Sequence, residues 1–249
     1  MIPKIKYFLH LADTPMILGQ RLGEWCGHGP VLEHDIALTN IALDLIGQAR
    51  LLYQFIAADK TVNSTEDKLA MLRYEHEYYN LLLVEQPNKD FGHTIMRQFL
   101  YDAFNLLQYQ QLSNHQDDNL KSIAVKTIKE IKYHYRYSSE WVLRLGEGTE
   151  TSHSIMQNAL NELWRYTGEM FESSGYEKEL INENFVIDSS TLFDPWSEKI
   201  EAITSQAGLI IPKDEVMIKG GKEGKHTEHM GYILTELQYM QRTYPEMHW

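Results

Sequence analysis

Apolar residues recur every three to four positions along most of the chain, which is the spacing of one face of an α-helix. This spacing predicts helices over residues 32–58, 91–113, 117–145, 152–172, 194–206 and 226–243. No stretch alternates convincingly between apolar and polar residues, and residues 185–188 (FVID) fit either a short strand or a loop. The pattern therefore predicts an all-α chain.

Capping signals predict where two further helices begin. Asp13-Thr14-Pro15 places proline in a first turn, so we expect a helix from there to the glycines of CGHGP. Ser64-Thr65-Glu66-Asp67 opens a helix that we expect to stop near Pro87. Two long helix pairs result, each with polar residues set into an apolar face. This arrangement predicts a four-helix bundle with additional C-terminal helices, in one domain spanning residues 1–249.

The composition excludes several classes of function. The 249 residues are 43% hydrophobic and carry 23 basic against 35 acidic side chains, a net charge of -12. A chain this acidic lacks the basic face that nucleic acid needs. Cys26 is the sole cysteine, which excludes an internal disulfide and indicates a reducing compartment. With no apolar run of about 18 residues and no signal peptide, we expect a cytoplasmic protein without a membrane partner.

Two polar residues interrupt apolar stripes. Asp102 lies on the stripe of Phe99 and Leu106, so its carboxylate should point into the bundle, where it must protonate, pair or bind a cation. His134, in TIKEIKYHYRYSS, should also face inward. The residue three before it is Ile131, whereas Glu130 is turned away by roughly 100°. His134 is thus either part of a metal site or a core histidine, with Asp102 as one candidate partner.

A working di-iron centre lacks enough ligands. Glu24 is a third candidate, although Arg21 one turn back offers it an ion pair. On the second long helix, the corresponding pair of positions holds Leu45 and Gln48, and leucine cannot ligate iron. Three candidates fall short of the roughly six ligands that two irons need. A reduced mononuclear iron site, in an independent metal-dependent oxygenase, remains the alternative.

Four segments resemble the family of the C subunit of phenylacetyl-CoA epoxidase, the non-catalytic ferritin-like subunit of that enzyme. They are residues 16–53 (MILGQRLGEWCGHGPVLEHDIALTNIALDLIGQARLLY), 81–104 (LLLVEQPNKDFGHTIMRQFLYDAF), 128–150 (IKEIKYHYRYSSEWVLRLGEGTE) and 220–245 (GGKEGKHTEHMGYILTELQYMQRTYP). The resemblance implies a ferritin-like fold and a sister relation to the di-iron catalytic subunit. That subunit's ligand pattern falls here on Glu24, Leu45, Gln48, Asp102, Ile131 and His134. These positions are then a vestigial site, with Ile131 in place of a lost glutamate, and no metal, catalytic or cofactor-binding residue is expected in this chain.

The resemblance also implies a role and partners. The family's chain is the structural, non-catalytic subunit of a multicomponent monooxygenase in aerobic phenylacetate degradation. The complex takes electrons from an iron-sulfur flavin reductase and uses NADPH and oxygen to epoxidise the ring of phenylacetyl-CoA. We therefore expect a hetero-oligomer with the di-iron catalytic subunit, with the reductase and small accessory subunits as further candidate partners. A helical scaffold unrelated to oxygenation is the third hypothesis.

Two C-terminal features have competing interpretations. The glycine-lysine run 219–225 precedes a helix and fits either a CoA phosphate site or, more simply, a mobile solvated loop. His226 and His229 flank Glu228 with a spacing that occurs in zinc sites, but no third ligand is evident, so we expect His226 to pack inside. Finally, we expect Asp102 and His134 to contact each other, with Gln48 nearby, in a polar pocket that holds water.

Overall fold

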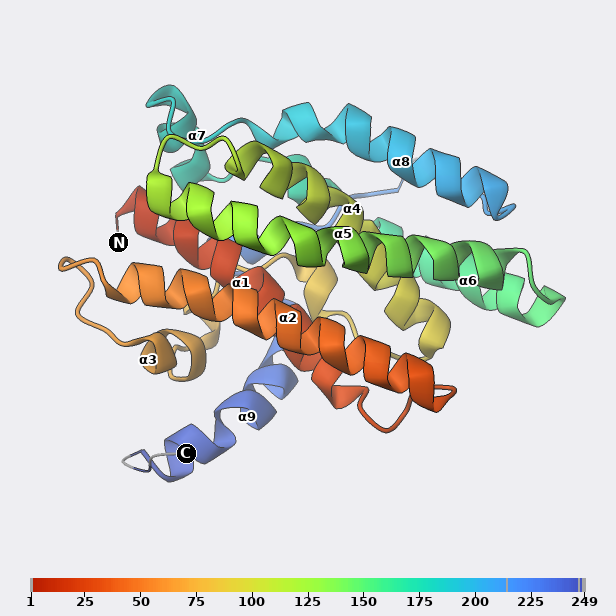
Figure 1. The fold of residues 1–249 in the computed structure, drawn as a ribbon, viewed down its shortest axis with the longest axis horizontal. Helices are drawn as coiled ribbons and strands as arrows, with labels where there is room; N and C mark the ends of the chain where they lie inside the picture. Colours follow the sequence, from red (N-terminus) through yellow and green to blue (C-terminus); the bar gives the residue numbers. More distant parts are fainter. Residues whose placement is uncertain (1, 214, 246, 248–249) are drawn as a thin grey trace. The chain divides into compact units, whose positions relative to one another are not determined.

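The computed structural model describes residues 2–213, 215–245 and 247 and is built from helices (Figure 1). The described residues contain no strand, and residues 185–188 lie in a loop after α7 (Gly175–Asn182). The predicted all-α, ferritin-like class is confirmed. Contacts divide the chain into two compact units, Met1–Pro87 with Gly220–Trp249, and Asn88–Lys219. Whether they fold together as one domain stays a prediction.

The first unit is built on two long helices, α1 (Pro3–Glu24) and α2 (Leu32–Ala57), which pack against each other. They approach closely at Gly19, where an added Cβ would lie 2.9 Å from Ile46 Cγ1 and 3.4 Å from Leu45 Cβ. The short helix α3 (Glu66–Met71), the 3₁₀ turns Glu75–Glu77 and Leu82–Glu85, and α9 (Glu228–Thr243) complete the unit. Residues from both ends of the sequence thus share one core.

Two predictions in this unit were wrong. The first helix begins at Pro3, so Asp13 is no cap and Pro15 lies in the helix interior. The predicted helix from residue 64 to near Pro87 ends at Met71. The cause is Arg73, whose Nε donates to the Leu69 carbonyl at 2.5 Å and whose Nη1 donates to the Glu77 carbonyl at 2.6 Å. The Arg73 side chain thus donates to carbonyl groups that would accept from backbone N–H groups in a continued helix. A buried ion pair with Asp13 fixes the position of this side chain.

The second unit is centred on α4 (Phe91–Leu112), which contacts α5 (Asp118–Gly146), α6 (Glu150–Trp164) and α8 (Phe193–Gln206). The Asp90 carboxylate caps α4 by accepting from the backbone N–H of His93 at 2.8 Å. Trp196 is fully buried, and its Nε1 donates to the Leu100 carbonyl at 3.1 Å. The helix predicted over residues 152–172 instead ends at Trp164, and α7 was missed.

Candidate functional site

The six positions of the expected vestigial site fall on four helices. Glu24, Leu45 and Gln48 belong to the first unit, and Asp102, Ile131 and His134 belong to the second. Leu45 and Ile131 are each 0% exposed, and Leu45 packs where α1 and α2 meet at Gly19. Both side chains are therefore core residues, and the vestigial site itself stays a prediction.

Glu24 forms an ion pair with Arg21, as the sequence had suggested. Arg21 Nη1 donates to Glu24 Oε2 at 2.8 Å, and its Nε and Nη2 donate to the Glu85 carbonyl at 3.0 and 2.8 Å. Arg21 is buried while the Glu24 side chain is 21% exposed. Arg21 thus connects the last turn of α1 to the 3₁₀ turn that contains Glu85.

Asp102 is buried in a cluster of neutral donors. Gln98 Nε2 donates to Asp102 Oδ1 at 2.7 Å, and the Ser138 hydroxyl donates to Oδ2 at 2.8 Å. Burial raises the pKa of Asp102 to about 7, and the charge of nearby His134 and these two hydrogen bonds only partly oppose it. The prediction that Asp102 points into the interior is confirmed. Its direct contact with His134, and the place of Gln48 and water beside it, stay predictions.

These residues do not fit a pair of irons. Leu45 and Ile131 have no donor atom, and the Gln48 amide is a poor ligand for iron. Among the described residues, no three histidine, cysteine, aspartate or glutamate side chains lie together so that they could hold a metal ion.

A buried charged site in the first unit was not predicted from the sequence. Glu85 Oε1 accepts from His226 Nδ1 at 2.6 Å and from Asn80 Nδ2 at 2.9 Å. Oε2 accepts from the backbone N–H and the hydroxyl of Thr227 at 2.8 and 2.6 Å. Thr227 directly precedes α9, so the carboxylate lies at the positive end of that helix.

The ring of His226 is positioned to be doubly protonated. Its Nε2 lies 3.0 Å from the Tyr78 carbonyl oxygen, so both ring nitrogens face oxygen acceptors. Burial opposes the charged ring, but the hydrogen bond and charge of Glu85, the Tyr78 carbonyl and Glu75 outweigh it and raise the pKa of His226 above 6.5. Neither nitrogen is left for zinc.

The middle of the glycine-lysine run packs against the segment that contains His76 and Asn80. Gly221 and Lys222 are buried, and a Cβ on Gly221 would lie 2.2 Å from the Asn80 carbonyl oxygen. Gly224 has φ +77°, and a Cβ there would lie 2.3 Å from the His76 carbonyl oxygen. Gly221 and Lys222 are thus packed rather than solvated, whereas Lys219, Glu223 and Lys225 are exposed; phosphate binding by the run stays a prediction. The Glu85 carboxylate lies at the N-terminus of α9 and accepts from the Thr227 N–H, which is the place predicted for a CoA phosphate.

A second buried ion pair joins α1 to the segment after α3. Both Arg73 Nη1 and Nη2 donate to the Asp13 carboxylate, which also accepts from the Tyr53 hydroxyl at 2.6 Å and the Tyr79 backbone N–H at 2.8 Å. Burial alone would lower the pKa of Arg73, but Asp13 reverses the direction and raises it. The guanidinium also lies 4.0 Å from the centre of the Tyr78 ring.

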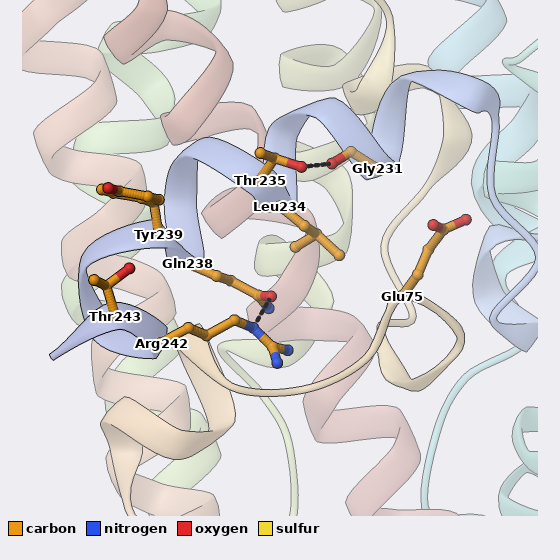
Figure 2. A pocket seen from close by; sticks show the side chains of 8 residues that line it. All are labelled: Glu75, Gly231, Leu234, Thr235, Gln238, Tyr239, Arg242 and Thr243. Carbon is orange, nitrogen blue, oxygen red and sulfur yellow. Dashed lines mark hydrogen bonds between the residues drawn. The ribbon is translucent and has the colours of Figure 1, made fainter. Parts of the chain in front are cut away.

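A shallow groove of about 380 Å³ runs along α9 and is lined by Glu75, Leu234 and Gln238, among others (Figure 2). Figure 2 shows Arg242 turned toward Gln238, whose Oε1 accepts from Arg242 Nε at 2.7 Å. Gln238 Nε2 in turn donates to the Arg73 carbonyl at 2.8 Å. These polar groups hold α9 in place, and the groove contains no arrangement of nucleophile and base.

Weak sequence signals pointed to the polar groups that we missed. Gln98 precedes Asp102 by four residues and Ser138 follows His134 by four, so each shares a helix face with a residue that we had singled out. Glu85 directly follows the apolar run 81–84. Nothing in the sequence, however, pairs Glu85 with His226, because the two lie 141 positions apart.

Together these features define an all-α protein of ferritin-like class in which the buried carboxylates Asp13, Glu85 and Asp102 accept hydrogen bonds from groups of the same chain. Within its described residues, no helix is long and apolar enough to span a membrane. The family model of the phenylacetic acid catabolic proteins matches residues 2–249, and the chain belongs to that family. It is 45% identical over 243 residues to the C subunit of 1,2-phenylacetyl-CoA epoxidase from Escherichia coli (strain K12), and the match covers 98% of each chain.

Proposed function

We propose that this chain is the structural, non-catalytic subunit of a phenylacetyl-CoA epoxidase and that it supports a di-iron catalytic subunit in phenylacetate degradation. The family match and the relative that is named as an epoxidase subunit support the complex. Leu45 and Ile131 support the structural role, because they are apolar and 0% exposed at positions where the resemblance implies that the catalytic sister has ligands.

The replacement is physically reasonable for a subunit that performs no chemistry. A buried carboxylate without a metal must be neutralised or paired, at a cost of several kcal/mol. Leucine and isoleucine avoid that cost and contribute about 1.5–3 kcal/mol each through burial. The chemistry, with NADPH as the source of electrons, then belongs to the other subunits of the cytoplasmic complex.

Iron content of the purified proteins tests this proposal. The chain is expressed alone with ample iron, then together with the catalytic subunit, and both samples are analysed for metal and for epoxidation of phenylacetyl-CoA. We expect no stoichiometric iron or activity in the lone chain, and about two irons per heterodimer. One tightly bound iron in the lone chain, lost in Asp102→Ala, would instead support the independent oxygenase.

A further inference from the structure

The outer face of α9 carries two exposed tyrosines. Tyr232 is 72% exposed and Tyr239 60%, whereas Met230 and Ile233 on the opposite face are fully buried. The tyrosines belong to a row of exposed residues that recur at alternating spacings of four and three. We name this row the tyrosine stripe, and it consists of Glu228, Tyr232, Thr235, Tyr239 and Arg242. The spacing is that of the seam along which one helix packs against another.

The tyrosine stripe is complementary to itself when it is turned end to end. Thr235 is its middle residue, with a tyrosine on each side, an acid seven residues before it and a base seven residues after it. Two stripes can therefore pair antiparallel about a two-fold axis beside Thr235. Tyr232 then lies next to Tyr239 of the second copy, and Glu228 lies next to Arg242 of the second copy. Because such a contact is isologous, it contains each of these pairs twice.

The charged ends of the stripe are able to form these contacts. Glu228 makes no ion pair with any residue that the structure describes. Arg242 Nε donates to Gln238 Oε1 at 2.7 Å, and Nη2 lies 3.4 and 3.2 Å from the carbonyl oxygens of Leu72 and Arg73. Nη1 has no hydrogen-bond partner within the described part of the chain. It can thus donate to a carboxylate while the other contacts hold the guanidinium in place.

The groove beside the stripe offers room for a tyrosine of the second copy. Gly231, Thr235 and Tyr239 are among the residues that line it (Figure 2). Gly231 lies four residues before Thr235 and Tyr239 four residues after it, so Tyr239 of the second copy falls opposite Gly231. Outside the neighbouring turns, a Cβ at Gly231 would meet Glu75 Oε2 at 3.7 Å, which is an ordinary contact. The fold does not require glycine there, although glycine destabilises a helix interior, whereas an open groove floor does require it.

We propose that the tyrosine stripe of α9 is a self-association surface, which pairs antiparallel with the same stripe of a second copy of this chain. Tyrosine is enriched at protein interfaces, and the two Glu–Arg contacts set the direction of pairing. Each chain carries a net charge of -12. At physiological salt, however, charges more than about 8 Å apart are largely screened, so the groups at the contact decide. The inference goes beyond the proposed function and does not rest on it.

Charge reversal tests the pairing. The full chain is studied by sedimentation velocity up to about 100 μM, because one pair of helices about 21 Å long buries little area and suits a weak dimer. We expect a concentration-dependent dimer. Glu228→Arg and Arg242→Glu should each weaken it about tenfold, because each change creates two contacts between like charges. The matched control Glu198→Arg, at an exposed position of α8, should change the affinity less than about twofold.

A mixture of the two variants separates a lost contact from a damaged fold. Combined in equal amounts, Glu228→Arg and Arg242→Glu chains should regain the affinity of the wild type. One chain then carries bases at both ends of the stripe, and the other carries acids at both ends. A variant that merely folds badly would not be rescued in this way, and circular dichroism of each variant provides a second check.

Two further variants test the geometry of the contact. Gly231→Leu should weaken the dimer about tenfold, because it fills the groove floor opposite Tyr239 of the second copy. Glu236 is exposed and follows Thr235 directly, so the two copies of Glu236 face each other beside the axis. Glu236→Gln should therefore tighten the dimer about twofold, because it removes this repulsion.

The other outcomes overturn the proposal. A chain that stays monomeric, or a dimer that all of these variants leave unchanged, shows that the stripe does not pair with itself. A mixture that associates no better than either variant alone has the same meaning. If the wild type is monomeric and Tyr239→Ser loses binding to the catalytic subunit, that subunit covers the stripe. Self-association is then wrong, and the proposed function stands.

Discussion

Asp102→Asn should stabilise the protein at pH 8 and leave its stability nearly unchanged at pH 4. Burial raises the pKa of Asp102 from an ordinary 3.8 to about 7. Between these values the unfolded chain releases a proton that the folded chain keeps, so raising the pH favours unfolding. At 1.36 kcal/mol per pKa unit, the difference between the unfolded and folded pKa values lowers the free energy of unfolding by at most about 4 kcal/mol above pH 7. Because asparagine does not ionise, the variant keeps this part of the free energy of unfolding at high pH.

Asparagine also fits the site. Its oxygen can accept from Gln98 Nε2, as Asp102 Oδ1 does at 2.7 Å. Its amide nitrogen can donate to Ser138 Oγ, which lies 2.8 Å from Asp102 Oδ2. The Ser138 hydroxyl then keeps an acceptor, because the Tyr135 carbonyl oxygen is 3.3 Å away. The substitution therefore changes the charge while all of these groups keep a partner.

Urea unfolding followed by circular dichroism, at each pH from 4 to 8, measures the effect. The stability gap between Asp102→Asn and wild type should open between pH 4 and 7 and then stay constant. A gap that is the same at every pH, or a less stable variant at pH 8, would refute the reasoning. In the assembled complex the variant should retain full epoxidation activity, whereas an Asp102 that held iron would not tolerate the change.

Further substitutions test the packing and the charged contacts. Glu85→Ala should lower the free energy of unfolding by about 3–5 kcal/mol, because it leaves a buried imidazolium unpaired. The pKa of His226 is raised in the folded protein, so its contribution to the free energy of unfolding is complete below pH ~6.5 and is lost as the pH rises through the folded-state pKa. His226→Gln should abolish this pH-dependent loss of stability in urea titrations. Leu45→Ala should cost about 2–5 kcal/mol in the same assay without altering iron content. Gly221→Ala should destabilise, since its Cβ would lie 2.2 Å from a carbonyl oxygen, whereas Gly47→Ala, with open space on a helix, should stabilise by about 0.5–1 kcal/mol; melting temperatures of the two variants should move in opposite directions.

The sequence predicted helices well where apolar periodicity ran uninterrupted over several turns. The expected ranges 91–113 and 117–145 differ from α4 (Phe91–Leu112) and α5 (Asp118–Gly146) by one residue at most at each end. The range after residue 64 failed because Arg73 pairs with Asp13, 60 positions away, and its side chain replaces backbone partners. Local patterns contain no information about such a distant partner.

The same limit applies to the candidate site. An acid and a histidine inside apolar stripes were visible as Asp102 and His134, since burial of a polar group contradicts the local pattern. Their neighbours Gln98 and Ser138 were not, because glutamine and serine are common on helices and gain meaning only through packing. The packed turn at Gly221 was misread for a related reason, since glycine and lysine are also typical of exposed loops.

The buried acids Asp13, Glu85 and Asp102 show how each unit avoids an uncompensated charge. In the first unit, Asp13 faces the guanidinium of Arg73, and Glu85 faces the ring of His226, whose pKa is raised. Both partners also fix the course of the chain. The donors to Asp102 are the neutral Gln98 and Ser138, and its pKa of about 7 favours the protonated acid below neutral pH. A proton can therefore take the place that a metal cation holds in a carboxylate-bridged bundle. The proposed structural role requires nothing more at this position.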